Sequence, residues 1–405
     1  MKLKKTMILF AFFLFLTACE IDEAEETNSN SNSIITESDH TQELYYSPES
    51  LAAYLEGMAS KYPEITLLKS FGKSTSGQDL WVIEISDNPG LKEMEPRIRL
   101  TGSIHGNEPI SGEILILFID YLLTNYESKS EIKFLIDNSY IAIIPILNPD
   151  GINKNTRENA NGIDLNRNFS SHWVSGYDHG DNPFSEKESQ AFQAYSLENN
   201  FHLSATFHSG EVIVNLPFDY DRESSGIYPE EYDLVKSLGK LYSTSGTFLK
   251  NENLLNLPEV ELGTVNGGDW YIVNGSLQDW SYLETGCLDL TIELAKNNPQ
   301  TEEGIEKIYN YNQESLLAYM AAAQNGIYGQ ITDNNDQPLP NVKISVTGGD
   351  LIVSSDSNGF YHKILWPGAY TLNFSLAGYK SSSSLVELSE NNIKQEINIT
   401  LFESD

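Results

Sequence analysis

Residues 98–123 have the sequence IRLTGSIHGNEPISGEILILFIDYLL, which predicts a strand, a loop and a helix in that order. The strand is expected at 98–104 and the strongly apolar helix at 114–123. His105 and Glu108 lie between them, three residues apart, where the helix opens. An imidazole nitrogen and a carboxylate in that arrangement can face one point, and both are good zinc ligands. A lone pair of this kind often occurs by chance, so its meaning depends on the rest of the chain.

The same alternation of strands and helices extends over residues 42–325. Further strands are expected at 140–147, 203–207 and 288–294, and further helices after the capping pair Ser47-Pro48 and at 301–323. The run at 140–147 is almost continuously apolar, which is typical of a central strand covered on both sides. We therefore expect an α/β domain with a mixed or mostly parallel sheet and helices on both faces.

After Gly326 the pattern changes to short alternating apolar runs separated by turn pairs such as Asn358-Gly359 and Pro367-Gly368. This pattern predicts a small all-β sandwich over residues 326–405. The segment carries no cluster of His, Asp and Glu that looks catalytic, so its expected role is structural or adhesive.

The first 19 residues have the features of an export signal. Three lysines precede an apolar run at 7–16, which is too short to span a bilayer as a helix. The run ends in Leu16-Thr17-Ala18-Cys19, which resembles the lipobox of bacterial lipoproteins and implies cleavage before Cys19 and lipidation of its sulfur. We expect an exported, extracytoplasmic lipoprotein anchored to a bacterial membrane; a simple secretion signal is the alternative. Residues 20–41 are acidic and rich in Ser and Asn, which predicts a flexible tether.

The composition excludes several classes of protein. The 405 residues include 25 basic and 58 acidic ones, a formal charge of −33, so nucleic-acid binding is not expected and basic peptides are plausible ligands. The acidity could also serve only to keep an exported protein soluble. The chain has two cysteines, Cys19 and Cys287. If Cys19 carries lipid, no internal disulfide can form, and Cys287 is expected to be a small buried hydrophobe.

Chemically active side chains follow several of the expected strands. His105, Asn148, His208 and Glu293 all lie in or just after a strand, and ligands bind at the carboxyl ends of strands in open α/β sheets. A set formed by His105, Glu108 and His208 would leave one position of a zinc ion free for water, as in catalytic sites. Glu293 lies in an apolar strand, so its carboxylate must be paired, ligating or catalytic. The other histidines are expected to be solvated or structural: His40, His172, His179, His202 and His362.

A polar loop follows Asn148-Pro149-Asp150-Gly151 and holds two of the chain's few arginines, Arg157 and Arg167. Guanidinium groups pair with carboxylates through two parallel hydrogen bonds. The loop could therefore bind a substrate carboxylate, or it could simply be held by internal salt bridges.

Together these segments resemble the zinc metallocarboxypeptidases, and in particular their regulatory N/E branch, which includes carboxypeptidases D, E and N. The shared phrases are His105-Gly106-Asn107-Glu108, Asn148-Pro149-Asp150-Gly151, Asn166-Arg167-Asn168 and Thr291-Ile292-Glu293-Leu294, in the family's order. That branch carries a transthyretin-like β-module directly after its catalytic domain, as residues 326–405 would.

The resemblance implies a role for each matching residue. His105, Glu108 and His208 match the ligands of one zinc ion per catalytic domain, and Glu293 matches the general base. Arg157 matches the cation that stabilises the oxyanion. The groups that hold the terminal carboxylate of the substrate are matched by Asn166, Arg167 and Tyr282. Such an enzyme hydrolyses the C-terminal residue of peptides or proteins.

The resemblance also suggests the preferred residue. In the N/E branch an acid after the Asn-x-Pro segment selects terminal Arg or Lys, and Asp219 occupies that position here, with Gln278 as a second polar lining group. Ser209, Glu211 and Leu216 depart from the family pattern, and Glu211 could be a rival specificity residue. We expect a monomer that prefers basic C-termini. The alternatives are a carboxypeptidase of cell-wall peptides or apolar C-termini, and a catalytically silent, lipid-anchored peptide-binding protein.

Overall fold

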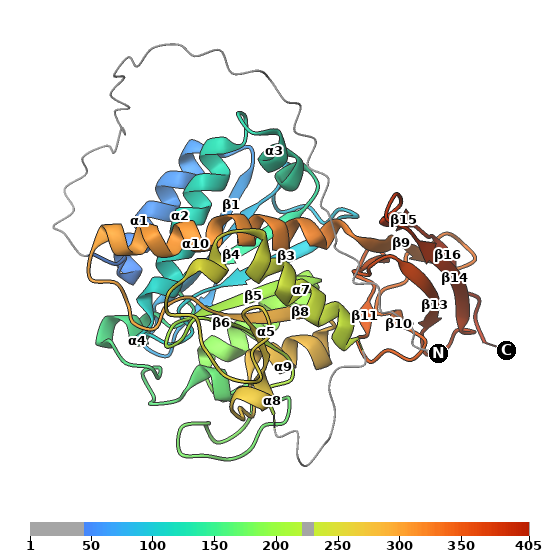
Figure 1. Cartoon of the computed structure of the whole chain (residues 1–405). Helices are drawn as coiled ribbons and strands as arrows, with labels where there is room; N and C mark the ends of the chain where they lie inside the picture. The colour runs from blue at the N-terminus through green and yellow to red at the C-terminus, as the bar shows by residue number, and fades with distance from the viewer. Residues whose placement is uncertain (1–43, 221–230, 405) are drawn as a thin grey trace, which may run out of the picture. The chain divides into compact units, whose positions relative to one another are not determined.

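The computed structural model describes residues 44–220 and 231–404. The expected signal segment 1–19 with Cys19, and the whole expected tether 20–41 with His40, lie outside these residues. The centre of the first part is an eight-stranded mixed sheet with the strand order β1-β2-β4-β3-β5-β8-β6-β7 (Figure 1). The strands are β1 (Thr66–Lys73), β2 (Asp79–Ile85), β3 (Arg97–Thr101), β4 (Tyr140–Ile144), β5 (Leu203–His208), β6 (Ile213–Leu216), β7 (Thr264–Asn266) and β8 (Leu288–Glu293).

The four central strands β4, β3, β5 and β8 run parallel to one another, and every residue in them is buried. Alternate residues of β4 enter different cores: Ile141 and Ile143 join one apolar cluster, whereas Tyr140, Ala142 and Ile144 join the other. A strand with both faces covered needs apolar residues at every position, which explains the continuous apolar run in the sequence.

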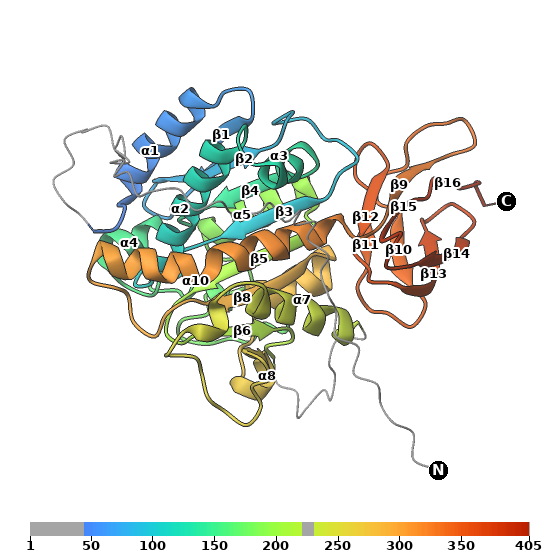
Figure 2. The ribbon, with the colours of Figure 1, turned by 45° about the horizontal axis from the view of Figure 1, so that its top comes forward.

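Helices cover both faces of this sheet (Figure 2). The helices are α1 (Pro48–Lys61), α2 (Pro109–Asn125), α3 (Ser130–Asp137), α4 (Pro149–Lys154), α5 (Lys187–Asn199), α7 (Tyr232–Ser245), α8 (Gly267–Trp270), α9 (Leu277–Trp280) and α10 (Glu302–Ala321). Residues of α1, α2, α7 and α10 join the cluster that holds Ile141, and α5 joins the opposite cluster through Phe192 and Tyr195. The expected helix after Ser47 is present, and the Ser47 side chain accepts a hydrogen bond from the Ser50 amide.

The second part is all-β, as the turn pattern predicts. Its strands are β9 (Gly326–Thr332), β10 (Lys343–Val346), β11 (Val353–Ser354), β12 (Phe360–Lys363), β13 (Gly368–Ser375), β14 (Ser382–Leu388), β15 (Lys394–Glu396) and β16 (Ile399–Thr400). They form two sheets, β11-β10-β13-β14 and β12-β9-β15, and β16 also pairs with β9. Ile331, Ile344, Leu372 and Phe374 are fully buried in the core that these strands share.

Buried polar contacts join this β-domain to the α/β domain. Arg97 Nη2 lies 2.8 Å from Asp356 Oδ2, and both side chains are 3% exposed. The carboxylate of Glu231 accepts hydrogen bonds from the Asp350 and Leu351 amides and forms an ion pair with Lys363. Within residues 44–220 and 231–404, every helix is too short or too polar to cross a membrane.

Candidate active site

The side chains of His105, Glu108 and His208 converge at the carboxyl ends of neighbouring parallel strands. His208 is the last residue of β5, and His105 follows the adjacent strand β3. Glu108 is the N-cap residue of α2, which begins at Pro109. His208 Nδ1 lies 3.2 Å from His105 Nδ1 and 3.1 Å from Glu108 Oε2, and His105 Nδ1 lies 2.9 Å from Glu108 Oε1. The sequence prediction for these three residues agrees with this geometry.

Close backbone packing fixes the turn that carries His105. A Cβ atom added to Gly106 would lie 2.0 Å from the carbonyl carbon of Gly151, so a side chain cannot fit at this position. Gly151 lies in α4, whose N-cap is Asn148, and the Asn148 side chain accepts from the Gly151 amide. The two quoted phrases around Gly106 and Gly151 therefore pack against each other, and this contact sets the position of the imidazole.

The three side chains fit a zinc ion. Two imidazole nitrogens and one carboxylate are the donor types that zinc prefers, and their ligand atoms lie within 4.8 Å of one another. His105 Nε2 lies 3.0 Å from Asp164 Oδ1, which orients the ring and leaves Nδ1 directed at the cluster. A carboxylate behind a ligating histidine is a common feature of zinc sites.

Glu293 lies beside this cluster. It is the last residue of β8 and stands opposite His208 in the register of the two parallel strands. Its Oε2 atom is buried and has no hydrogen-bond partner within the described part of the chain. Burial raises the pKa of the Glu293 carboxyl to about 8, and the nearby Glu108 charge adds to the rise. A carboxyl group whose pKa is raised in this way is suited to accept and return a proton near neutral pH.

A cleft of about 230 Å³ opens over these groups. The expected site residues that line it are His105, Glu108, Arg157, Asn166, His208, Asp219 and Glu293. Arg157 Nη1 lies 3.3 Å from Glu108 Oε1, and Arg157 Nε lies 2.9 Å from Asp164 Oδ2. Asp164 thus holds both His105 and Arg157, a role that the sequence pattern did not reveal, although Asp164 lies two residues before the Asn166-Arg167-Asn168 phrase.

Arg167 and Gln278 lie behind the cleft wall. Arg167 Nη1 donates to the main-chain oxygen of Asn166 at 2.9 Å, and the Asn166 side chain accepts from the Leu277 amide. Gln278 Oε1 accepts from the Thr291 amide at 2.7 Å, and its Nε2 donates to Asp219 Oδ1 at 3.1 Å. Both residues therefore support groups that face the cavity.

Asp219 is a buried acid in the wall of the cleft. It is 3% exposed, and its Oδ1 accepts from Asn215 Nδ2 at 2.8 Å in addition to Gln278. Burial raises the pKa of Asp219 to about 6. Its main-chain amide donates to Asp279, which fixes the loop that carries it. A buried carboxylate with only neutral donors around it is well suited to bind a cationic group.

The assignment of Tyr282 to the carboxylate cradle is wrong. Its hydroxyl donates to Asp350 at 2.7 Å and to Glu231 at 3.2 Å, where the β-domain meets the α/β domain. The tyrosine that lines the cleft is Tyr271, which is 46% exposed and whose phenol pKa is raised to about 12, chiefly by burial and then by Glu293. Tyr271 and Tyr282 lie on either side of Gln278 in the sequence, so order along the chain alone could not separate the two.

Cys287 and the histidines outside the metal cluster have structural or surface positions. Cys287 is fully buried, and burial raises its pKa to about 12, which agrees with a structural thiol. His202 accepts a hydrogen bond from the Arg97 amide, and His362 is buried in β12. His172 is exposed, as expected, and its ring stacks on Tyr220 with ring centroids 3.4 Å apart.

Comparison with known proteins agrees with this geometry. Residues 51–315 match the zinc carboxypeptidase family, and residues 327–405 match the CarboxypepD_reg-like domain. Carboxypeptidase SOL1 from Arabidopsis thaliana is 32% identical over 353 residues, which are 86% of this chain and 70% of that protein. Carboxypeptidase D from Homo sapiens is 33% identical over 368 residues, or 87% of this chain but 26% of that protein. The chain thus spans about a quarter of carboxypeptidase D.

Solved structures show the same fold. Carboxypeptidase A from Helicoverpa armigera superimposes with a TM-score of 0.59 and 20% sequence identity, over 69% of this chain and 73% of that one. The similarity to the family covers most of the α/β domain, including every residue of the metal cluster and Glu293. The chain therefore belongs to the zinc carboxypeptidase family.

Proposed function

We propose that this metallocarboxypeptidase removes a C-terminal Arg or Lys from peptides or proteins, with zinc held by His105, Glu108 and His208. The family uses one zinc ion per catalytic domain. The observation that carries the proposed specificity is the buried Asp219 carboxylate in the wall of the same cleft that holds the metal cluster. A terminal guanidinium or ammonium group would pair with that charge, whereas an apolar side chain would leave it unpaired.

The chain's own residues would share the reaction as follows. Zinc, when bound, supplies a Lewis acid for the scissile carbonyl and for a water molecule. Glu293 takes a proton from the attacking water and returns it to the leaving amine. Arg157 stabilises the negative charge that develops on the carbonyl oxygen. Asp164 supports this role because it holds the Arg157 guanidinium beside Glu108.

The free carboxylate of the substrate would be held by Asn166 and Tyr271, and Arg167 would place its positive charge behind them. Asn166 and Tyr271 line the cleft. The positive charge of Arg167 is close enough to oppose the rise in the pKa of both Tyr271 and Asp219. An internal peptide segment offers no free carboxylate to such a cradle, so the enzyme would act as an exopeptidase.

The specificity can be tested with peptides that differ only in the last residue, namely Arg, Lys, Phe and diaminopimelate. We expect kcat/KM for Arg and Lys to exceed that for Phe, and Asp219→Ala to lower the Arg-to-Phe ratio by about 100-fold, since it removes a buried partner for the cation. Asp336→Asn, an exposed change in the β-domain, is the matched control. An undiminished ratio in Asp219→Ala would refute the pocket assignment, and faster cleavage of Phe or diaminopimelate would favour the apolar or cell-wall alternative.

We also propose that the protein is a lipid-anchored, extracytoplasmic lipoprotein of a bacterial membrane and that it acts as a monomer. The apolar run at 7–16 followed by Leu16-Thr17-Ala18-Cys19 supports the anchor. One chain contributes the metal ligands, the base and the carboxylate cradle, which supports the monomer. Metabolic labelling with palmitate tests the anchor: we expect label in the wild type and none in Cys19→Ser, and an unlabelled wild type would contradict it.

A further inference from the structure

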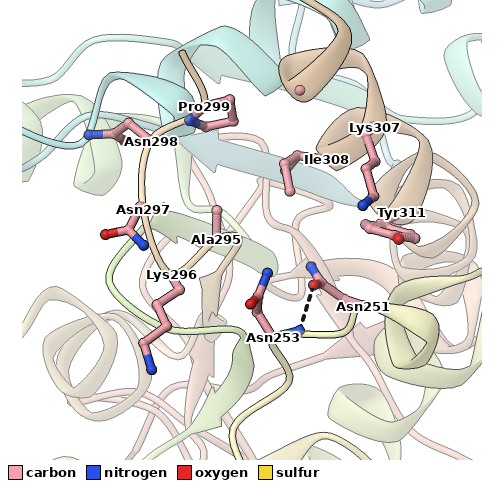
Figure 3. A pocket seen from close by; sticks show the side chains of 11 residues that line it. Asn251, Asn253, Ala295, Lys296, Asn297, Asn298, Pro299, Lys307, Ile308 and Tyr311 are labelled. Carbon is pink, nitrogen blue, oxygen red and sulfur yellow. Dashed lines mark hydrogen bonds between the residues drawn. The ribbon is translucent and has the colours of Figure 1, made fainter. Parts of the chain in front are cut away.

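A second pocket, of about 280 Å³, lies at the start of α10. We call it the amide pocket and define it by Asn251, Asn253, Lys296, Asn297, Lys307 and Tyr311. Figure 3 shows Lys307 and Tyr311 from α10 on one side and Ala295 and Asn297 on the other, with Asn251 and Asn253 below them and the Lys296 side chain at the outer edge. Ala295, Pro299 and Ile308 form an apolar part of the lining.

One side chain in the wall of the amide pocket, Asn251, indicates that the pocket binds a ligand. Asn251 is 5% exposed, and its Oδ1 accepts from the Asn253 amide at 3.1 Å. This bond fixes which end of the side-chain amide faces the pocket. The Nδ2 atom is buried and has no hydrogen-bond partner within residues 44–220 and 231–404. A buried donor without an acceptor is costly, so the pocket is built to receive a hydrogen-bond acceptor.

The charge of the lining residues indicates which hydrogen-bond acceptor the pocket would bind. The whole chain carries 58 acidic and 25 basic residues, yet the lining contains Lys296 and Lys307 and no Asp or Glu. Lys307 pairs with Glu252 at 3.2 Å, but these side chains are 53% and 73% exposed, so the pair is weak and readily exchanged. Cations beside an unpaired amide donor favour a carboxylate.

The amide pocket is joined to the metal cleft by hydrogen bonds. Ser209, which follows the ligand His208 and lines the cleft, donates from Oγ to Asn298 Oδ1 at 3.2 Å. Asn298 lines the amide pocket, and its Nδ2 donates to the main-chain oxygen of Asn107, next to Glu108. The Gly210 amide donates to the main-chain oxygen of Ala295. The segment 295–298 is therefore the wall between the two cavities.

We propose that the amide pocket binds the carboxylate of an Asp or Glu side chain that lies upstream of the scissile bond in the peptide substrate. The inference rests on the proposed function, because a peptide whose last residue fills the cleft must carry its preceding residues out across the rim. Lys307 and Asn251 Nδ2 would bind the carboxylate, Lys296 would add its positive charge at the edge of the pocket, and the apolar part of the lining would contact the methylene groups. The preferred substrate would thus be an acidic peptide segment that ends in a basic residue.

The negative net charge of the protein helps to distinguish binding in the amide pocket from a general effect of peptide charge. A chain with a net charge of −33 repels acidic peptides, so an acid at a position that meets no cationic pocket should lower kcat/KM. We would compare alanine-based peptides ending in Arg, each with one Glu or one Gln at the second, third, fourth or fifth residue from the end. We expect Glu to raise kcat/KM about three- to tenfold over Gln at one of these positions. A Glu-to-Gln ratio at or below one at every position would overturn the inference.

Matched pairs of variants test whether the preference for Glu depends on the amide pocket. Lys296→Gln with Lys307→Gln should abolish the Glu preference and leave the Gln peptides unchanged. Lys236→Gln with Lys240→Gln changes the net charge equally at two lysines of α7 that pair with Glu261 and do not line the amide pocket, and should keep the preference. Asn251→Ala removes the buried donor and should reduce the preference without a change in cations. A preference that survives the Lys296 and Lys307 changes would refute the inference, whereas failure to cleave any of these peptides would overturn the proposed function itself.

Discussion

The two tyrosines Tyr271 and Tyr282 give a direct test of the cleft geometry, because each change should affect one property and spare the other. Tyr271→Phe removes a hydroxyl group from the cleft, and Tyr282→Phe removes one from the contact with the β-domain. We expect Tyr271→Phe to raise KM with little change in stability. We expect Tyr282→Phe to lower stability with little change in KM.

The size of each effect follows from the contacts. Tyr282 is fully buried and donates to the carboxylates of Asp350 and Glu231, and hydrogen bonds to charged groups contribute about 1.5–3 kcal/mol. Phe keeps the edge-on contact with the Phe218 ring, so we expect a loss of about 1.5–3 kcal/mol in the free energy of unfolding. Tyr271 is 46% exposed, so the loss of one bond to a substrate carboxylate should raise KM about two- to tenfold.

The assay combines urea unfolding with steady-state kinetics on one peptide ending in Arg, for the wild type and both variants. An amidated version of the peptide adds a control, because it offers no free carboxylate and its slow cleavage should not respond to Tyr271→Phe. The reasoning would be refuted by the crossed result, in which Tyr282→Phe raises KM at unchanged stability while Tyr271→Phe leaves KM unaltered.

Three further outcomes are expected. Asp356→Ala should lower the free energy of unfolding by about 3–5 kcal/mol, because it leaves the buried Arg97 unpaired. Glu387→Ala, an exposed change in β14, should alter it by less than about 0.5 kcal/mol, and equal effects in urea unfolding would contradict this. The Arg-to-Phe ratio of kcat/KM should fall as the pH drops through about 6. Burial raises the Asp219 pKa to about 6, and protonation below that pH removes the charge that would bind a basic residue. A ratio that stays constant from pH 5 to 8 would argue against an ionised Asp219. A chelator should abolish hydrolysis and added zinc should restore it, and activity that resists chelation would exclude a catalytic metal.

The metal cluster could be predicted from the sequence because strand ends define it. His105, His208 and Glu293 each follow an apolar run, and parallel neighbours in one sheet bring such ends together. The expected strands and helices are present, but their ends differ. The strand expected at 140–147 is β4, which ends at Ile144, although the apolar run continues to Leu147. The added apolar residues are buried in the loop that leads to Asn148, so hydrophobicity alone could not mark the end of the strand.

The two tyrosines could not be separated in this way because both lie between β7 and β8, where the chain forms short turns. Tyr271 has an extended backbone directly after the four-residue helix α8. Tyr282 lies in a five-residue π-helical turn, Ser281–Thr285, that follows α9. The direction of a side chain in such turns depends on local hydrogen bonds and not on a repeating period, so the sequence pattern carries little information about it.

The contacts of the β-domain are the least predictable feature, and they explain where Tyr282 acts. Arg97 and Asp356 are 259 positions apart, and no pattern in either segment marks them as partners. The Tyr282 hydroxyl bonds to Asp350 beside β11, while its ring packs on Phe218, the residue before Asp219. The β-domain is thus linked through one buried side chain to the loop that carries Asp219. Since that link runs through packing and not through the reacting groups, weakening it should appear as lower stability before it appears as lost selectivity.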